Sequence, residues 1–258
     1  MADRTALITG ASAGLGSEFA RQLAASGVNL VLVARREKPM RALAEQLTAA
    51  HGINVDILLA DLSDPVAPAA LFDEVSARGL EIDYLVNNAG SEGPDLIRDE
   101  DWQACRDYLE LMTISVAAMC HYFVPPMQQR GFGRVLNVAS VAGLISVSGD
   151  YSYGPSKAYI VAFSRGLSLS MRDSGVRVCA LCPGFTHTDF HASAKLTKMK
   201  QATPDFIWYD ADVVVREGLA ALEKGRDVCT SGRLYRFLVP LLGSPFGRWL
   251  VSALGAKP

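Results

Sequence analysis

Six short apolar runs recur along the first 182 residues of the chain, with helix-like segments between them. They read TALIT (5–9), NLVLVA (29–34), NVDILLA (54–60), DYLVN (83–87), RVLNVA (134–139) and VRVCALC (176–182). Apolar runs of this length are typical of strands buried on both faces of a parallel sheet. Their alternation with helical segments indicates βαβ units, so the sequence predicts an α/β fold with a doubly wound parallel sheet.

The chain shows no break that would divide it into domains. No Pro/Gly/Ser-rich linker, repeat or low-complexity segment interrupts it, so we expect one domain over residues 1–258. The alternation of strands and helices lapses over residues 185–212, which form either a substrate lid or a plain surface excursion.

The tail, residues 233–258, departs from the rest of the chain. From Val228 onward there is no Asp or Glu, and apolar residues recur at helical spacing on both sides of Pro240 and Pro245. These apolar faces either cap the core or a second subunit, or they wall an apolar pocket and touch an anionic membrane.

Composition limits the partners and the location of the protein. With 258 residues, 50% hydrophobic, 20% charged and a net charge of -2, the chain is an ordinary globular one. Lysines and arginines form no basic stripe, so we expect no nucleic acid partner.

A strand-like run begins by residue 5 and no apolar stretch reaches the length of a membrane span, so neither a signal peptide nor a span is expected. Five cysteines, an odd number, suit a reducing compartment, and we expect a cytoplasmic protein.

Cysteine and histidine show no convincing metal-binding pattern. Cys179 and Cys182 read C-x-x-C but lie within a strand-like run, where core thiols are the better interpretation. His187 and His191 are four residues apart just after a turn, which is more typical of a pocket wall or a surface. We therefore expect no metal.

A glycine-rich turn follows the first predicted strand. In TGASAGLG, Gly10, Gly14 and Gly16 lead into a helical pattern. Glycines here allow a sharp turn and a close approach to a pyrophosphate, whose charge sits at the positive end of the helix dipole. The spacing is G-x-x-x-G-x-G, and its place between a strand and a helix favours a dinucleotide site over a structural turn.

The second predicted strand ends in Ala34, Arg35 and Arg36, where an NAD-binding protein would place an acid on the adenosine ribose. Without that carboxylate, an arginine fork can bind a 2′-phosphate. The residues therefore favour NADP over NAD, with solvation of the strand end by one or both arginines as the alternative.

Six motifs in this order resemble those of the short-chain dehydrogenases/reductases, from residue 4 to about 190. They are TGASAGLG (9–16), ADL (60–62), NNAG (87–90), NVAS (137–140), YGPSK (153–157) and PGFTHT (183–188). The resemblance implies a Rossmann fold and an NADP(H)-dependent oxidoreductase that interconverts a carbonyl and an alcohol. We expect the substrate to be a hydrophobic ketone, an acyl compound or a steroid-like compound, because the tail and residues 185–212 would wall an apolar pocket.

The resemblance also selects one tyrosine among the three in YSYGPSKAY (151–159). In the family the Tyr-x-x-x-Lys pair follows a serine by about a dozen residues, and here Ser140 precedes Tyr153 by thirteen. Ser140, Tyr153 and Lys157 are therefore the catalytic candidates. Tyr151 and Tyr159 have no lysine four residues further on and are assigned to packing.

Elementary chemistry supports the same roles. A phenol with a pKa near 10 is a poor acid-base catalyst at neutral pH, so a cation that lowers this pKa is expected beside it. Lys157 lies one helical turn beyond Tyr153 and can supply that charge. We expect Tyr153 to protonate the carbonyl oxygen while Ser140 hydrogen-bonds it.

The resemblance further implies a set of cofactor contacts. Asp61 and Leu62 would lie by the adenine, residues 87–90 would line the cofactor cleft, Lys157 would hold the nicotinamide ribose and Thr188 would meet the nicotinamide carboxamide. They fall at the glycine-rich turn, at the ends of the following strands, on the catalytic helix and in the loop after the sixth strand: Gly10, Ser12, Gly14, Leu15, Gly16, Arg35, Arg36, Asp61, Leu62, Asn87, Ala89, Gly90, Tyr153, Lys157, Pro183, Gly184, Thr186 and Thr188.

One position departs from the family pattern. An asparagine that helps to hold a relay water is expected about fifteen residues before Met127, and counting back reaches Met112. A thioether cannot replace that amide, although Thr113 or Ser115 could. The departure leaves open a Rossmann-fold nucleotide-sensing protein as the alternative to an enzyme. By resemblance, residues 99–129 and the helix carrying Tyr153 imply a homodimer or homotetramer.

Overall fold

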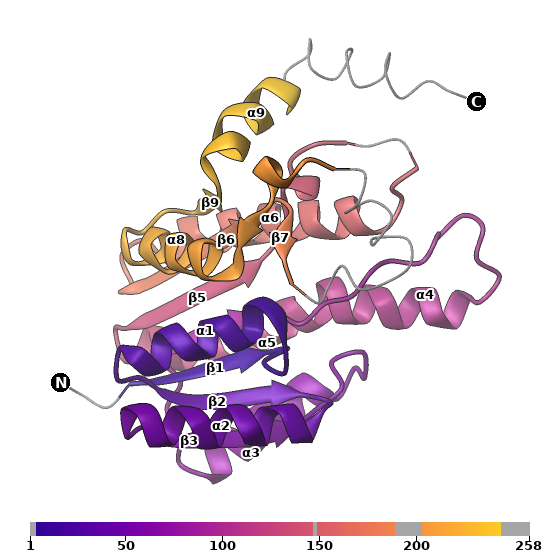
Figure 1. Ribbon diagram of the computed structural model, residues 1–258. Coiled ribbons are helices and arrows are strands. Elements are labelled where there is room, and N and C mark those ends of the chain that lie inside the picture. The colour runs from indigo at the N-terminus through magenta and orange to yellow at the C-terminus, as the bar shows by residue number, and fades with distance from the viewer. Residues whose placement is uncertain (1–3, 147–148, 189–202, 244–258) are drawn as a thin grey trace.

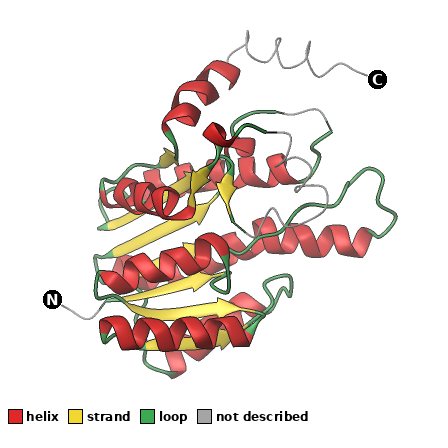
Figure 2. Cartoon of the chain, viewed as in Figure 1, coloured by secondary structure: helices red, strands yellow, loops and turns green. Residues whose placement is uncertain are grey.

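The computed structural model describes residues 4–146, 149–188 and 203–243 (Figures 1 and 2). Its centre is a seven-stranded sheet in the order β3-β2-β1-β4-β5-β6-β9, in which all paired strands are parallel. The strands are β1 (Thr5–Thr9), β2 (Asn29–Ala34), β3 (Val55–Leu59), β4 (Tyr84–Asn87), β5 (Gly133–Val138), β6 (Val176–Cys182) and β9 (Val228–Thr230). The predicted doubly wound parallel sheet is confirmed.

Helices cover both faces of this sheet, as Figure 2 shows. On one face lie α1 (Gly14–Ala25), α2 (Glu37–His51) and α8 (Ala211–Glu223), and on the other α3 (Ala67–Ala77), α5 (Ser115–Gln129) and α6 (Tyr153–Ser170). Helix α4 (Trp102–Leu109) runs into α5 through a π-helical turn, Glu110–Ile114. Two large apolar clusters fill the layers between the helices and the sheet, because the strands are apolar on both faces.

Smaller elements lie near the carboxyl end of β6. Strand β7 (Thr186–His187) pairs with β8 (Tyr209–Asp210), a short 3₁₀ turn spans Asp205–Ile207, and α9 (Arg233–Gly243) follows β9. No helix in the described ranges has the length and apolar character needed to cross a membrane.

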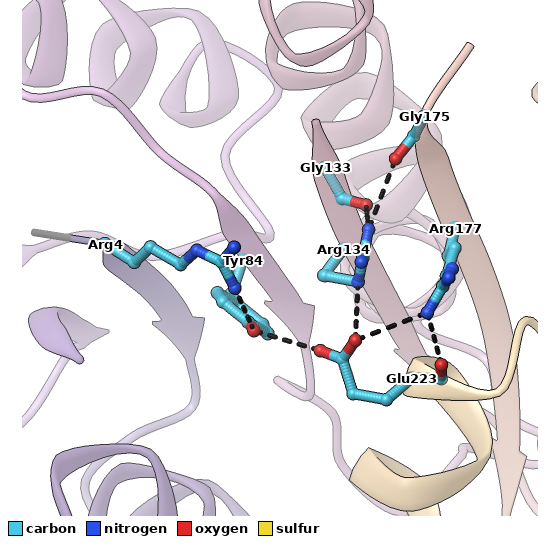
Figure 3. A network of polar contacts seen from close by, with 7 residues as sticks. All are labelled: Arg4, Tyr84, Gly133, Arg134, Gly175, Arg177 and Glu223. Atoms are coloured by element: carbon cyan, nitrogen blue, oxygen red, sulfur yellow. Dashed lines mark hydrogen bonds and ion pairs between the residues drawn. The ribbon is translucent and has the colours of Figure 1, made fainter. Parts of the chain in front are cut away.

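A charged cluster joins the amino-terminal ends of the strands to the end of α8 (Figure 3). Glu223 accepts hydrogen bonds from Tyr84 and Arg134, each at 2.9 Å, and forms a further ion pair with Arg177 at 3.5 Å. Arg4 donates to the Tyr84 hydroxyl, which extends the cluster to the start of β1. Because Arg134 is only 7% exposed, its guanidinium needs these partners, and the cluster is best understood as a structural one.

The strand order changes direction at β1: the chain adds β2 and β3 on one side of β1, then returns to add β4 on the other side. In open parallel sheets, ligands bind beyond the carboxyl ends of the strands at such a switch point. That edge carries the predicted site residues.

Candidate active site

The turn after β1 has the conformation that its glycines predict. Gly10 and Gly14 have φ of 66° and 57°, a region that other residues rarely adopt. A Cβ on Gly16 would lie 2.2 Å from the Gly10 carbonyl oxygen, so this turn and α1 pack too closely for any other residue. Helix α1 begins at Gly14, and Ala13 provides no side-chain cap. The N–H groups at this helix end therefore suit an anion such as a pyrophosphate.

Side chains from β1 and β4 hold this turn in place. The amide of Asn88 donates to the backbone oxygens of Thr9 and Gly10, at 2.9 and 3.3 Å. The Thr9 hydroxyl in turn accepts hydrogen bonds from the backbone N–H groups of Asn88 and Ala89. The motifs TGASAGLG and NNAG contain Thr9 and Asn88, and Asn88 was expected along the cofactor cleft, but the sequence did not predict that these two side chains hold the turn.

Asn87, by contrast, directs its side chain into the sheet. Its Nδ2 donates to Asn137 Oδ1 at 2.8 Å, and Asn137 donates to the Ser164 hydroxyl at 2.9 Å. This buried chain of polar groups ties β4 and β5 to α6. Asn87 thus occupies the predicted strand end, with its side chain engaged between strands.

The two arginines after β2 have different partners. Arg36 donates from Nε and Nη2 to the Ser12 hydroxyl, at 3.3 and 3.0 Å, and so lies against the glycine-rich turn. Arg35 pairs with Asp61 at 3.4 Å, and both side chains are largely exposed. Burial raises the pKa of Asp61, but hydrogen bonds from Ser63 and the charge of Arg35 outweigh it and hold that pKa below its usual range. Cationic and hydroxyl groups thus meet at the expected adenosine end.

The catalytic candidates come together just beyond β5 and at the start of α6. Ser140 begins a 3₁₀ turn, in which its hydroxyl accepts from the Ala142 N–H at 3.1 Å. Tyr153 is the first residue of α6, and Lys157 follows one turn later. A hydrogen bond joins the side chains of Ser140 and Tyr153. Lys157 Nζ lies 5.7 Å from the centre of the Tyr153 ring.

Burial dominates the protonation of this group. It raises the pKa of Tyr153 to about 12; the charges of Asp150 and Cys182 add to this and the hydrogen bond with Ser140 opposes it. Burial also lowers the pKa of Lys157 to about 8. The lowering of the Tyr153 pKa that was expected from Lys157 is not present in the cofactor-free protein, where burial sets the direction and the charge of Lys157 is not among the causes of the shift. Tyr153 is a neutral phenol at pH 7 and can donate a proton.

Lys157 is anchored beneath the site. It is 6% exposed, and its Nζ donates to the Val138 carbonyl oxygen at 2.8 Å. On its other side, a Cβ placed on Gly90 would lie 3.8 Å from Nζ and 3.2 Å from the Met112 sulfur. Met112 and Lys157 therefore border the same narrow space at Gly90.

Met112 lies in the π-helical turn and is 1% exposed. Its sulfur accepts a hydrogen bond from the Ser91 N–H at 3.4 Å. Thr113 and Ser115, the other residues considered for the relay, donate their hydroxyl hydrogens to the carbonyls one turn back, at 2.6 and 2.7 Å. Because each hydroxyl hydrogen is already donated within the helix, these two hydroxyls can only accept a hydrogen bond from a relay water.

The loop after β6 is fixed by a residue that the motifs do not predict. The Tyr235 hydroxyl of α9 accepts from the Phe185 N–H at 3.1 Å and donates to the Ile207 carbonyl at 2.9 Å. A Cβ on Gly184 would lie 2.0 Å from the Tyr235 ring, so this ring packs directly on the backbone. Thr188, the predicted carboxamide contact, lies opposite Gly14 of the glycine-rich turn, 3.4 Å from its Cβ position.

The predicted lid is described in part. Trp208 stacks with Phe185 and His187, at ring-centre distances of 5.0 and 5.4 Å, and is 6% exposed. Residues 189–202, with His191, lie outside the described residues, as do residues 244–258 of the tail. Within the described residues, no three His, Cys, Asp or Glu side chains are grouped to hold a metal ion.

Comparison with known proteins identifies the family. The family model described as short chain dehydrogenase matches residues 4–199. The chain therefore belongs to the short-chain dehydrogenases, as its motifs predicted.

Three individual proteins illustrate the range of the similarity. The 3-oxoacyl-(acyl-carrier-protein) reductase FabG of Escherichia coli K12 is 31% identical over 189 residues, which cover 72% of this chain and 75% of that protein. A short-chain dehydrogenase from Sphingobium yanoikuyae, solved in complex with NADPH, is 30% identical with a TM-score of 0.79, covering 97% and 92% of the two chains. An alcohol dehydrogenase specific for bulky-bulky ketones from Comamonas testosteroni is 25% identical with a TM-score of 0.78, covering 99% and 95%.

Proposed function

We propose that this protein is an NADP(H)-dependent oxidoreductase that interconverts a carbonyl and an alcohol. The observation that carries the proposal is the meeting of Ser140, Tyr153 and Lys157 at the carboxyl end of the sheet, on the edge where the glycine-rich turn lies. A neutral phenol hydrogen-bonded to a serine, with a lysine one turn away, is a proton donor beside a site for negative charge.

The cofactor assignment rests on the fit of the residues that would hold it. The glycine-rich turn and the start of α1 suit the pyrophosphate, and Arg36 with Ser12 suits a phosphate on the adenosine ribose. By resemblance, Thr188 and the backbone around Gly184 would meet the nicotinamide end of the cofactor. NADPH is also bound in the solved Sphingobium relative. When bound, the dinucleotide supplies or accepts the hydride.

The residues of the chain manage the proton and the developing charge. Tyr153 donates its phenolic proton to the substrate oxygen during reduction, and Ser140 hydrogen-bonds that oxygen as negative charge accumulates. Lys157, when protonated, stabilises the phenolate that Tyr153 becomes. Its hydrogen bond to the Val138 carbonyl holds the ammonium 5.7 Å from the centre of the Tyr153 ring. In the oxidation direction the same groups act in reverse.

The substrate class that we propose is an apolar ketone, acyl compound or steroid-like compound. Phe185 and Trp208 line up as stacked rings in the described part of the lid, next to the loop assigned to the nicotinamide. The names of two similar proteins, a 3-oxoacyl-(acyl-carrier-protein) reductase and an alcohol dehydrogenase specific for bulky-bulky ketones, agree with such a class. We further propose a cytoplasmic homodimer or homotetramer. Exposed Ile114, Tyr159 and Leu169, on the helices implied by the family, support a contact between subunits.

A nucleotide-sensing protein without catalysis is the second candidate. It is favoured by Met112, which puts an apolar sulfur at the Gly90 backbone, a position that Lys157 also approaches and where the family is expected to have an asparagine. Such a protein would bind the dinucleotide and turn over no carbonyl compound.

Oxidation of NADPH and of NADH, measured against a panel of ketones, aldehydes, acyl thioesters and steroid carbonyls, tests the proposal. We expect turnover with NADPH and the best rates with the apolar members. Tight binding of NADPH without turnover of any member would favour the sensing protein, and the absence of dinucleotide binding would contradict both candidates.

A further inference from the structure

Helix α9 has one side fixed to the protein and another that faces away from it. Tyr235 and Val239 are buried, with 9% and 8% exposure. At about 100° of rotation per residue, Phe237 lies on roughly the opposite side of the helix from both. Phe237 is 74% exposed, and Leu241, one turn further, is 50% exposed. The outward side therefore carries large apolar groups that do not cover the core.

Polar contacts hold the start of α9 in this orientation. The Leu234 N–H donates to the Tyr209 hydroxyl at 3.2 Å, and the Gly232 N–H donates to Glu217 at 2.8 Å. Arg236 pairs with the same Glu217 at 2.6 Å. Figure 1 shows α9 rising from the β9 edge of the sheet, away from the helices that cover its faces. The helix is thus attached at its base while its outward side stands clear of the described body.

Charge is distributed unevenly between this region and the rest of the chain. Residues 228–258 contain four of the 25 basic residues and none of the 27 acidic ones, which gives a formal charge of +4. The remaining 227 residues hold 21 basic and 27 acidic residues, a formal charge of -6. Arg233 is exposed and, at about 40° from Phe237 around the helix, belongs to the same outward side.

We propose that the outward side of α9, formed by Arg233, Phe237 and Leu241, docks on the surface of an anionic lipid bilayer. A helix with apolar and basic residues on one exposed side lies in the interfacial region, with its apolar groups among the acyl chains and its arginines near the phosphates. A second copy docked through the same side would bring like charges together at Arg233, whereas an anionic bilayer attracts this side and repels the acidic remainder of the chain. Charge therefore favours the bilayer and also sets the orientation of the bound protein.

The docking surface is independent of the reaction proposed above. None of its three residues belongs to the candidate active site, so vesicle binding and turnover are measured separately. The docking surface and the candidate active site are connected through α9, because Tyr235 on the buried side of this helix fixes the loop at Phe185. A bilayer-bound protein would have its lid region near the source of an apolar substrate.

Sedimentation with sucrose-loaded vesicles tests the proposal on the full-length protein. Vesicles of phosphatidylcholine containing about one third phosphatidylglycerol are compared with pure phosphatidylcholine, in low salt and in about 0.5 M salt. We expect binding to the anionic vesicles in low salt, little binding to the neutral ones, and a marked loss in high salt. The double variant Phe237→Ser/Leu241→Ser should lower the partition coefficient at least about tenfold, and Arg233→Glu should lower it as well.

Matched variants elsewhere on the surface serve as controls. Ile97→Ser removes an apolar side chain that is 72% exposed, close to the 74% of Phe237. Lys224→Glu makes the same charge change as Arg233→Glu on an exposed residue at the end of α8. Both should leave binding unchanged, and the melting temperature of every variant checks its fold. The proposal is overturned if the wild-type protein does not bind anionic vesicles, or if the double variant binds as well as the controls. A dimer in light scattering that Phe237→Ser dissociates, without vesicle binding, would assign this side to a second copy.

Discussion

Lys157→Met should make the cofactor-free protein more stable at neutral pH while removing a residue assigned to catalysis. Burial lowers the pKa of Lys157 from its usual 10.5 to about 8, which corresponds to roughly 3 kcal/mol in favour of the neutral amine. The ammonium is thus held in the folded state at a cost. Losing its hydrogen bond to Val138 takes back about 1 kcal/mol, so the net gain is about 2 kcal/mol.

The sign of the pH dependence follows from the two pKa values. Between pH 8 and 10.5 the unfolded chain binds a proton at Lys157 that the folded protein has released, so wild-type stability rises with pH in this interval. The cost of the ammonium is fully present below about pH 8 and has disappeared above 10.5. The advantage of Lys157→Met should therefore be greatest at pH 6–8 and shrink as the pH rises further.

Thermal and denaturant unfolding of the cofactor-free variants measure this effect. A gain of about 2 kcal/mol corresponds to a rise of roughly 4–8 °C in the melting temperature for a chain of this size. Lys157→Arg, which keeps a positive charge at every pH, is the control and should show no such gain. A Lys157→Met protein that is less stable than wild type at pH 7, or whose advantage does not change with pH, would refute the reasoning.

Four further substitutions have defined outcomes. Arg36→Ala should weaken NADP binding about tenfold or more with little effect on NAD binding, since charge-assisted contacts contribute about 1.5–3 kcal/mol. Arg35→Ala should have the smaller effect, because Arg35 also pairs with Asp61. Equal dissociation constants for NADP and NAD in the wild-type protein, measured by calorimetry, would contradict both predictions. Tyr235→Phe deletes the hydroxyl that joins the Phe185 N–H to the Ile207 carbonyl, and should cost about 1–3 kcal/mol of unfolding free energy and raise the KM for the cofactor. An unchanged denaturation midpoint would argue against this role of Tyr235. Glu223→Gln removes the charge shared by the cluster at the amino ends of the strands, and should lower the free energy of unfolding by about 1–2 kcal/mol after solvent screening. This difference from wild type should disappear when both proteins are unfolded in high salt.

The fold could be predicted from the sequence because its strands are apolar on both faces. Six of the seven strands of the sheet were expected, because each is an apolar run that can be recognised from its own residues without knowing which strand it pairs with. Strand β9, Val228–Thr230, was missed because three residues carry no pattern of their own; it forms by pairing with Ala180–Cys182 of β6. The two-residue strands β7 and β8 were missed for the same reason.

The candidate site was predictable where its residues lie close in sequence or in ordered motifs. Ser140, Tyr153 and Lys157 were selected by their match to the family's motifs, and the structure brings them together. Tyr235 could not be found in this way, because it meets Phe185 across 50 positions of the chain. The direction of the Tyr153 pKa was also mispredicted, since it depends on how deeply packing buries the ring and not on the neighbouring lysine alone.

Turnover of Tyr153→Phe, with the best substrate of the carbonyl panel, tests the central claim most directly. The variant keeps the ring and deletes the proton that the proposed reduction requires, and Tyr151→Phe, on an exposed tyrosine two residues earlier, is its control. We predict that kcat falls about 10²–10⁴-fold in Tyr153→Phe, that the dissociation constant for NADPH changes by less than about threefold, and that the control behaves as wild type. A Tyr153→Phe protein that retains wild-type kcat would contradict the account.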